Sequence, residues 1–411
     1  QQELAERPTK SLAAYDAFLR GESISNSLAS SDPPSLRQAL KYYQQATSLD
    51  PSFAVAWSRV SMVAALLYSN SVPTNELAEL ARNAAERSRE LAPNSADTYA
   101  ALGGYASFVT VDARQALTYY EAGLESNPAI AFLINRTSAV QQSLGHWNEA
   151  LALIRRAQIL DPRSVSISSR IATTALWLRN YPEAQEAADR AVALAPTSLT
   201  TLQNRAMIAL ARGDLPGARA IIAESPAGIN QDALVSYMTE YWDLYWVLTD
   251  AQQARVLQLS PAAFDNDRGA WGIGLAEIYG LRGDAIRSRA YADSAVSALE
   301  QQLKAAPQDP QRRVVLGLAL AYLGRPADAI REGEHGVALD PVSRDAVTAS
   351  YNLHQLMRIY LLTGQTDKAL DTLEQLLKTP YYLSPGWIRI DPTFAPLKGN
   401  PRFERLANGS V

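Results

Sequence analysis

Two sixteen-residue stretches that lie 34 positions apart decide how this chain folds: residues 147–162 read WNEALALIRRAQILDP, and residues 181–196 read YPEAQEAADRAVALAP. Each has a small residue twelve and five positions before its closing proline, Ala150 and Ala157 in the first stretch. With the residue eight before the proline, this spacing marks one face of a helix. Proline then stops the helix, because it lacks an amide hydrogen and clashes with the preceding turn.

The same pattern recurs along most of the chain. Pro128, Pro162 and Pro196 follow one another at intervals of 34 residues, as do Pro307 and Pro341. An alanine stands twelve residues before a proline at six positions: Ala39, Ala81, Ala116, Ala150, Ala184 and Ala329. Small side chains at one phase of a helix let a second helix approach closely, so these alanines predict the contact between the two helices of a repeated pair.

A glycine near the middle of many units divides the unit into two helices. Gly145, Gly213, Gly283, Gly324 and Gly364 each predict a left-handed turn that ends the first helix before the second begins. We expect about ten helix pairs over residues 1–380, ending near residues 51, 93, 128, 162, 196, 226, 261, 307, 341 and 380. Stacked pairs bury a continuous core, which predicts an all-α, right-handed superhelix.

Large residues fit a known repeat. Trp57 with Val60-Ser61, Tyr99 with Leu102-Gly103, and Leu316-Gly317 hold the large and small positions of the tetratricopeptide repeat (TPR) motif, as does Trp271 with Leu275. The chain thus resembles the TPR family over most of its length. The resemblance implies a protein-binding solenoid whose first helices line a concave groove.

Composition argues against several other classes of function. Lys and Arg number 38 against 42 Asp and Glu, so the net charge of −4 offers no basic surplus for nucleic acid. The chain has no Cys, and its three His residues lie in different units without metal-ligand spacing. We therefore expect no catalytic residues, no metal and no cofactor. The longest apolar runs, such as 314–323, are too short to insert in a membrane.

Both ends of the chain carry a second resemblance. Residues 5–21, AERPTKSLAAYDAFLRG, are similar to the segment that opens the TPR region of bacterial multidomain signalling proteins of the Ser/Thr kinase, adenylate cyclase or winged-helix regulator type, often after a TolB- or FlgO-like domain. Residues 383–397, LSPGWIRIDPTFAPL, and 400–406, NPRFERL, are similar to their terminal motif. The resemblance implies an effector domain upstream and favours an extracytoplasmic location over a cytoplasmic one.

The tail also has a purely structural interpretation. The last repeat of a solenoid exposes an apolar face that something must cover. Residues 381–411 supply aromatic and aliphatic side chains between turn-forming prolines, which predicts an irregular C-terminal capping segment. A ligand or partner site in the same residues is the alternative.

Polar residues at matching phases of successive first helices form the main candidate site. Such residues are costly if buried without partners, and a hydrated groove removes that cost. We expect a partner-binding row across the groove, with an ordinary solvated helix face as the alternative: Asn135, Arg136, Gln142, Ser169, Arg170, Thr173, Trp177, Gln203 and Asn204. The row resembles the peptide-binding rows of TPR proteins, although the full carboxylate-clamp pattern is absent.

The seventh unit offers a second candidate. It predicts an aromatic helix whose five aromatic residues form two neighbouring stripes: Tyr237, Tyr241, Trp242, Tyr245 and Trp246. Exposed aromatic stripes anchor peptides or stack on sugars. A core role, in which large residues replace the missing alanines, is the alternative.

Together these features predict a non-enzymatic scaffold or sensor module that binds a protein or peptide. The alternative is a structural solenoid that assembles into dimers or filaments, since open solenoid ends invite such contacts.

Overall fold

The computed structural model describes residues 8–27 and 33–409, so residues 5–7 of the signalling-type segment and residues 410–411 of the expected cap lie outside the described residues. The chain divides into two compact units, Gln1–Ile171 and Ala172–Val411, which we call the N-terminal and C-terminal units. The division falls within one helix, and each unit is described by itself below.

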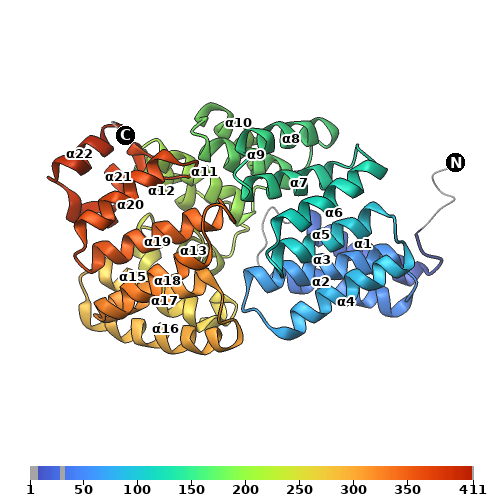
Figure 1. Cartoon of the computed structure of the whole chain (residues 1–411), viewed down its shortest axis with the longest axis horizontal. Coiled ribbons are helices and arrows are strands. Elements are labelled where there is room, and N and C mark those ends of the chain that lie inside the picture. The colour runs from blue at the N-terminus through green and yellow to red at the C-terminus, as the bar shows by residue number, and fades with distance from the viewer. Residues whose placement is uncertain (1–7, 28–32, 410–411) are drawn as a thin grey trace. The chain divides into compact units, whose positions relative to one another are not determined.

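The N-terminal unit consists of four complete helix pairs and the first part of a fifth (Figure 1). Its helices are α1 (Leu12–Ser27), α2 (Pro33–Leu49), α3 (Ala54–Asn70), α4 (Asn75–Leu91), α5 (Ala96–Phe108), α6 (Ala113–Ser126), α7 (Ala131–Ser143), α8 (Trp147–Leu160) and α9 (Val165–Trp177), which continues into the C-terminal unit.

The C-terminal unit continues the helix pairs and ends in three short helical segments. Its elements after α9 are α10 (Tyr181–Leu194), α11 (Leu199–Ala211), α12 (Leu215–Ala223), α13 (Gln231–Glu240), η1 (Leu244–Trp246), α14 (Asp250–Val256), η2 (Pro261–Phe264), α15 (Arg268–Leu281), α16 (Ala285–Ala305), α17 (Pro310–Leu323), α18 (Pro326–Leu339), α19 (Thr348–Leu362), α20 (Thr366–Lys378), α21 (Pro385–Ile390), η3 (Pro392–Leu397) and α22 (Pro401–Ala407).

The described residues thus form the all-α helix-pair solenoid that the repeat predicts. The six alanines that precede the repeat prolines are all fully buried. In the fourth pair, the Ser138 hydroxyl on α7 donates to the backbone carbonyl of Ala150 on α8 over 2.8 Å. A contact this short between a side chain and a neighbouring backbone is possible because Ala150 has only a methyl group.

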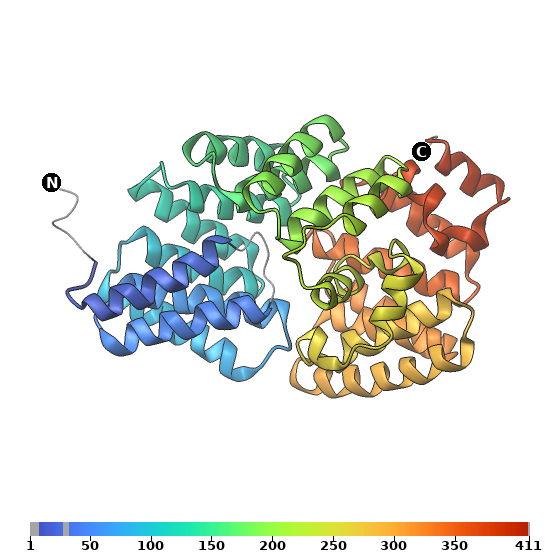
Figure 2. The ribbon, with the colours of Figure 1, turned by 180° about the vertical axis from the view of Figure 1, so that it is seen from behind.

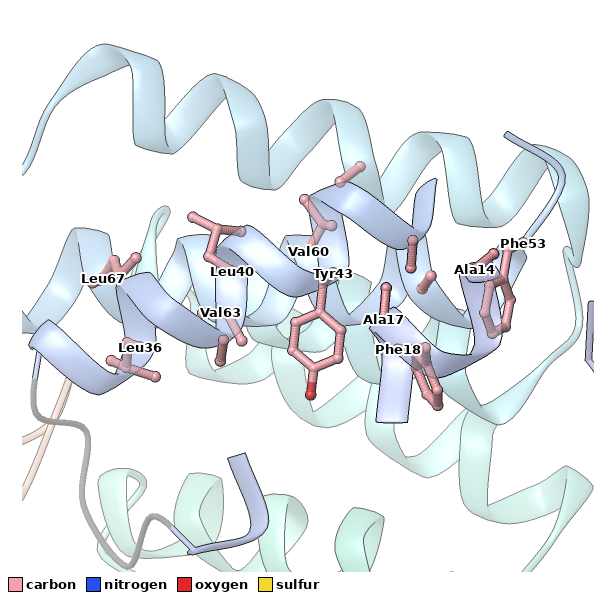
Figure 3. Close-up of a cluster of buried hydrophobic side chains, with 14 residues drawn as sticks. Ala14, Ala17, Phe18, Leu36, Leu40, Tyr43, Phe53, Val60, Val63 and Leu67 are labelled. Atoms are coloured by element: carbon pink, nitrogen blue, oxygen red, sulfur yellow. The ribbon is translucent and has the colours of Figure 1, made fainter. Parts of the chain in front are cut away.

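The first pairs show how the core is filled around the small residues. Figure 3 shows side chains of α1, α2 and α3 gathered in one cluster, with Phe18 between Tyr43 and Phe53. The ring centroids of Phe18 lie 5.8 Å from Tyr43 and 5.0 Å from Phe53. Phe18 therefore contacts both its partner helix α2 and the start of the next pair.

The glycine turns have the predicted backbone. Gly145, Gly213, Gly283, Gly324 and Gly364 all have φ between 75° and 88°, the left-handed region that favours glycine. The lengthened second helix of the eighth pair is also present, as the 21-residue α16.

The seventh pair departs from the prediction. The expected aromatic helix ends at Glu240, and Trp242 and Asp243 have φ of 64° and 56°, so the chain reverses there before η1 begins. The prediction that Tyr237, Tyr241, Trp242, Tyr245 and Trp246 form two stripes along one helix is therefore wrong. The break turns the later aromatic residues inward, where a continuous helix would have kept them on one side.

The C-terminal segment packs against the start of its own unit. Figures 1 and 2 both show α21 beside α11. The Ser384 hydroxyl donates to the carbonyl of Ala211 over 2.5 Å, and a Cβ on Gly386 would lie 2.5 Å from that same carbonyl oxygen. Segment 381–407 therefore lies along the inside of the C-terminal unit as well as beside α20, which goes beyond the terminal cap that the sequence predicts.

Among the described residues, no helix has both the length and the sustained apolar character needed to span a bilayer.

The alanine contact can be tested by adding volume. We expect Ala150→Leu to lower the free energy of unfolding by about 1–3 kcal/mol, because the added atoms meet α7 at a fully packed position. Urea unfolding followed by circular dichroism measures the change. Ala152→Leu on the exposed face of the same helix is the matched control and should shift stability by no more than about 0.5 kcal/mol. Equal effects of the two substitutions would refute the role of the small residue.

Candidate functional site

In the N-terminal unit, part of the predicted polar row comes together. Arg170 on α9 donates from Nε to the side-chain oxygen of Asn135 over 2.5 Å and from Nη1 to the side-chain oxygen of Gln142 over 3.0 Å. The Asn135 amide in turn donates to the Ser166 hydroxyl over 2.9 Å. Asn135, Gln142 and Ser169 are buried, whereas Arg170 is half-buried. The amides therefore orient the Arg170 guanidinium.

Arg136 lies beside this group, and its guanidinium packs over two aromatic rings. Its guanidinium carbon lies 5.1 Å from the ring centroid of Phe132 and 5.9 Å from that of Phe108. Phe132 is 36% exposed and Arg136 is half-buried, so both reach the surface. Within the described residues Arg136 makes no hydrogen bond and no ion pair, which leaves its five N–H donors available.

A third arginine, missed by the sequence analysis, shares the Phe132 ring. Arg59 on α3 lies 5.9 Å from the Phe132 centroid, and its guanidinium pairs with Glu22 and Asp97 at 2.8 Å each. We call Arg59, Phe108, Phe132, Arg136 and Arg170 the arginine–phenylalanine surface.

A signal in the sequence could have found Arg59. Arg59, Arg136 and Arg170 each lie eight residues after a repeat proline: Pro51, Pro128 and Pro162. Alignment of the units on their closing prolines hides this match, because the unit that ends at Pro93 is longer than the units that end at Pro162 and Pro196.

The electrostatics of the three arginines differ. Burial, and secondarily the positive charge of Arg59, lowers the pKa of Arg136. Burial, and then the charge of Arg136, lowers the pKa of Arg170 to about 10. Arg59 has two carboxylates at hand, whereas the pKa values of Arg136 and Arg170 show that their cationic forms are destabilised. An anion at this position would favour both charges.

The rest of the predicted row belongs to the C-terminal unit and has a different environment. Trp177 is buried, with ring centroids 5.8 Å from Trp242 and 5.4 Å from Tyr381. The Gln203 amide donates to the backbone carbonyl of Tyr241 over 2.7 Å. Asn204 is also buried, and Thr173 is half-buried. Trp177 and Gln203 therefore serve contacts within their own unit.

The aromatic candidates lie in the same interior. Tyr237, Tyr245 and Trp246 are buried, and Tyr241 and Trp242 are half-buried. Trp246 packs edge-on against Trp387 at 6.1 Å, and Trp242 packs against Tyr382 at 5.5 Å. These contacts to the C-terminal segment support the core alternative for this cluster.

A buried ion pair crosses the centre of the C-terminal unit. Arg358 on α19 donates to the Glu277 carboxylate over 2.5 Å, and an Asp243 carboxylate oxygen lies 3.4 Å from the Arg358 guanidinium. Burial disfavours the charge on Arg358, but Glu277 and the other anionic groups outweigh burial and hold the pKa of Arg358 well above its usual value. Burial raises the pKa of Glu277 despite its partner. This cation is compensated internally, unlike Arg136.

His354 lies one turn before Arg358 and is enclosed by tyrosines. Its Nδ1 is 3.2 Å from the Tyr381 hydroxyl and 3.0 Å from the Tyr382 hydroxyl. Burial, with a contribution from the positive charge of Arg358, lowers the pKa of His354 well below its usual value of 6.5. The imidazole therefore stays neutral in the folded protein and takes part in packing.

No family model matches the chain, and no curated protein matches its sequence. Solved structures do resemble it in fold. A human IFIT1 dimer with m7Gppp-AAAA has a TM-score of 0.45 at 13% identity, covering 74% of this chain and 68% of the other. The Cut9–Hcn1 hetero-tetramer of the APC/C has a TM-score of 0.42 at 14% identity, covering 99% and 77%.

A third structure is a tetratricopeptide repeat protein from Parabacteroides merdae, with a TM-score of 0.38 at 14% identity, covering 73% of this chain and 99% of the other. The described helix pairs of this chain resemble the helix pairs of these solved structures. Similarity at these levels of identity and TM-score carries no argument about what the chain binds.

The enclosure of His354 gives a pH dependence with a definite sign. Above pH 6.5 the histidine is neutral in both the folded and the unfolded chain; below it, only the unfolded chain gains the proton. Stability should fall by up to about 1.4 kcal/mol per pH unit below that value from this group. His354→Gln, which stays neutral, should flatten the fall between neutral and mildly acidic pH.

Urea unfolding midpoints measured across that pH range test the expectation. His335→Gln is the matched control, because His335 is exposed and should keep the slope of the unsubstituted protein. An unchanged slope in His354→Gln would show that the buried imidazole accepts a proton without cost.

Proposed function

We propose that this chain is a non-enzymatic binding scaffold, and that its N-terminal unit holds an extended, acidic peptide segment of a partner protein on the arginine–phenylalanine surface. The observation that carries the proposal is Arg136, a half-buried guanidinium with aromatic rings beneath it and no hydrogen bond or ion pair in the described part of the chain.

Charge favours an acidic partner. The lowered pKa values of Arg136 and Arg170 report that their cationic forms are destabilised where they stand. A carboxylate that accepts hydrogen bonds from a guanidinium removes this penalty, and charge-assisted bonds of this kind are roughly twice as strong as neutral ones. A basic segment would add to the repulsion.

Shape favours a peptide with an apolar side chain near the acid. Phe132 keeps 36% of its surface exposed between the Arg59 and Arg136 guanidinium groups. An aromatic ring held between two cations is a rigid platform on which an apolar side chain can lie. A segment with an acidic and an apolar residue in close succession would satisfy both features.

The C-terminal unit contributes differently in this proposal. Its row residues Trp177 and Gln203 are engaged by the unit's own side chains and backbone, so the recognition surface lies on α3, α5, α7 and the start of α9. If an effector domain is attached upstream, as the terminal segments suggest by resemblance, the scaffold would report partner binding to it.

Anisotropy of fluorescent peptide pools tests the proposal on the full chain. A random-sequence pool rich in Asp, Glu and Phe should bind, and Arg136→Gln should weaken binding about tenfold by removing a charge-assisted contact. Arg136→Ala together with Arg170→Ala should weaken it further. Added salt should also weaken it, because the surface is only half-buried.

Two controls isolate the effect. A pool in which Lys replaces the acidic residues should bind far less well, and Arg156→Gln, an exposed arginine on α8 in the same unit, should leave affinity unchanged. Absence of acidic-pool binding, or full affinity in Arg136→Gln with unaltered circular dichroism, would overturn the proposal. Light scattering on the same samples tests the self-assembly alternative, which predicts concentration-dependent oligomers.

A further inference from the structure

The C-terminal unit contains a cavity that the peptide proposal does not use. It has a volume of about 580 Å³ and opens where α12, η1, α14, the end of α15 and the α21–η3 junction meet. Cavities that hold small ligands have volumes of this order. Its walls come from five segments, and the last of them is held in place by Ser384 and Gly386 against α11.

One part of the cavity wall is apolar. The residues that form it come from four of the five segments: Leu215, Trp246, Leu281, Ile390 and Pro392. Leu281 is 40% exposed at this position, although it ends a helix whose inner face is buried. An apolar group of a ligand would cover the leucine and contact the indole of Trp246.

The cavity also carries charges that remain available. Arg219 Nε donates a hydrogen bond to the Val247 carbonyl over 3.1 Å, and Arg282 Nη2 donates one to the Asp250 backbone carbonyl over 3.2 Å. Neither guanidinium forms an ion pair within the described residues, and the same holds for the Asp250 carboxylate that lines the cavity with them. The remaining donors of both arginines can therefore bind an anion.

A buried amide adds a hydrogen-bond acceptor. Gln253 is only 4% exposed, and its side-chain nitrogen donates to the carbonyls of Tyr245 and Leu248 at 3.3 and 3.2 Å. These two bonds identify the nitrogen end and the oxygen end of the Gln253 side-chain amide. The opposite end, Oε1, accepts no hydrogen bond in the described part of the chain, and Gln253 lines the cavity.

We infer that this cavity binds a zwitterion of amino-acid or dipeptide size with a large apolar side chain. The carboxylate would pair with Arg219 and Arg282. The ammonium group would donate to Asp250 and to Gln253 Oε1, and the side chain would lie on the apolar wall. A simple fatty acid would leave Asp250 and Gln253 unused, and a simple cation would meet two guanidinium groups.

Isothermal titration of the full chain with the dipeptide Leu-Phe tests the inference. Arg282→Gln should weaken binding of Leu-Phe about tenfold, the loss expected for one charge-assisted contact. The same substitution should have little effect on Leu-Phe amide, which lacks the carboxylate. Asp250→Asn should weaken Leu-Phe but have little effect on N-acetyl-Leu-Phe, which lacks the ammonium group.

Two further variants test position and specificity. Leu281→Trp, which adds bulk to the cavity wall at an exposed position, should abolish binding with all charges in place. Arg344→Gln should leave affinity unchanged, since Arg344 is an exposed arginine that also donates to a backbone carbonyl but lies outside the cavity.

The inference is overturned if Leu-Phe fails to bind the unsubstituted chain. It is also overturned if Leu281→Trp keeps full affinity, or if the amide and N-acetyl dipeptides lose the same affinity as Leu-Phe in both charge variants. None of these results depends on Arg136, so the peptide proposal for the N-terminal unit stands or falls separately.

Discussion

The close approach of two helices at an alanine, repeated along the chain, is the contact on which the rest of this structure depends. At Ala150 the two helices of a pair meet with no space for a larger side chain. Large side chains fill the space elsewhere, both within a pair and between pairs: Phe18 of α1 contacts Tyr43 of its partner helix α2 and Phe53 at the start of the next pair. Contacts within each pair and between neighbouring pairs therefore stabilise the fold together.

This constraint also explains how much of the fold the sequence could predict. Helix ends and glycine turns follow from local chemistry: α8 and α10 end just before Pro162 and Pro196, and the Gly145-type turns lie where expected, whereas Pro261 begins η2 instead of closing a helix pair. The break at Trp242 has no such local signal, because no glycine or proline marks it. Contacts with Trp177 and Tyr382, distant in sequence, outweigh the cost of a left-handed backbone there.

Sequence spacing likewise determines only part of the candidate site, and tertiary packing determines the rest. The structure brings Asn135, Gln142 and Arg170 of the row together, although the sequence pattern places Asn135 and Arg170 at neighbouring rather than matching phases of adjacent first helices. That pattern could not foresee that Trp177 and Gln203 would be taken up by packing in the C-terminal unit. That outcome depends on where the terminal segment lies, and only tertiary contacts decide its path.

The buried and half-buried arginines differ in which groups compensate their positive charge. This difference distinguishes the arginines with a structural role from the one for which we propose a role in recognition. Arg358 has Glu277 and Asp243 within its own unit, and Arg59 has Glu22 and Asp97. Arg136 has aromatic rings, which offset only part of the cost of partial burial. A guanidinium left in this state destabilises the free protein slightly, and the same amount is recovered when an anion binds. This is why the peptide-binding proposal rests on Arg136 among the polar residues of the predicted row.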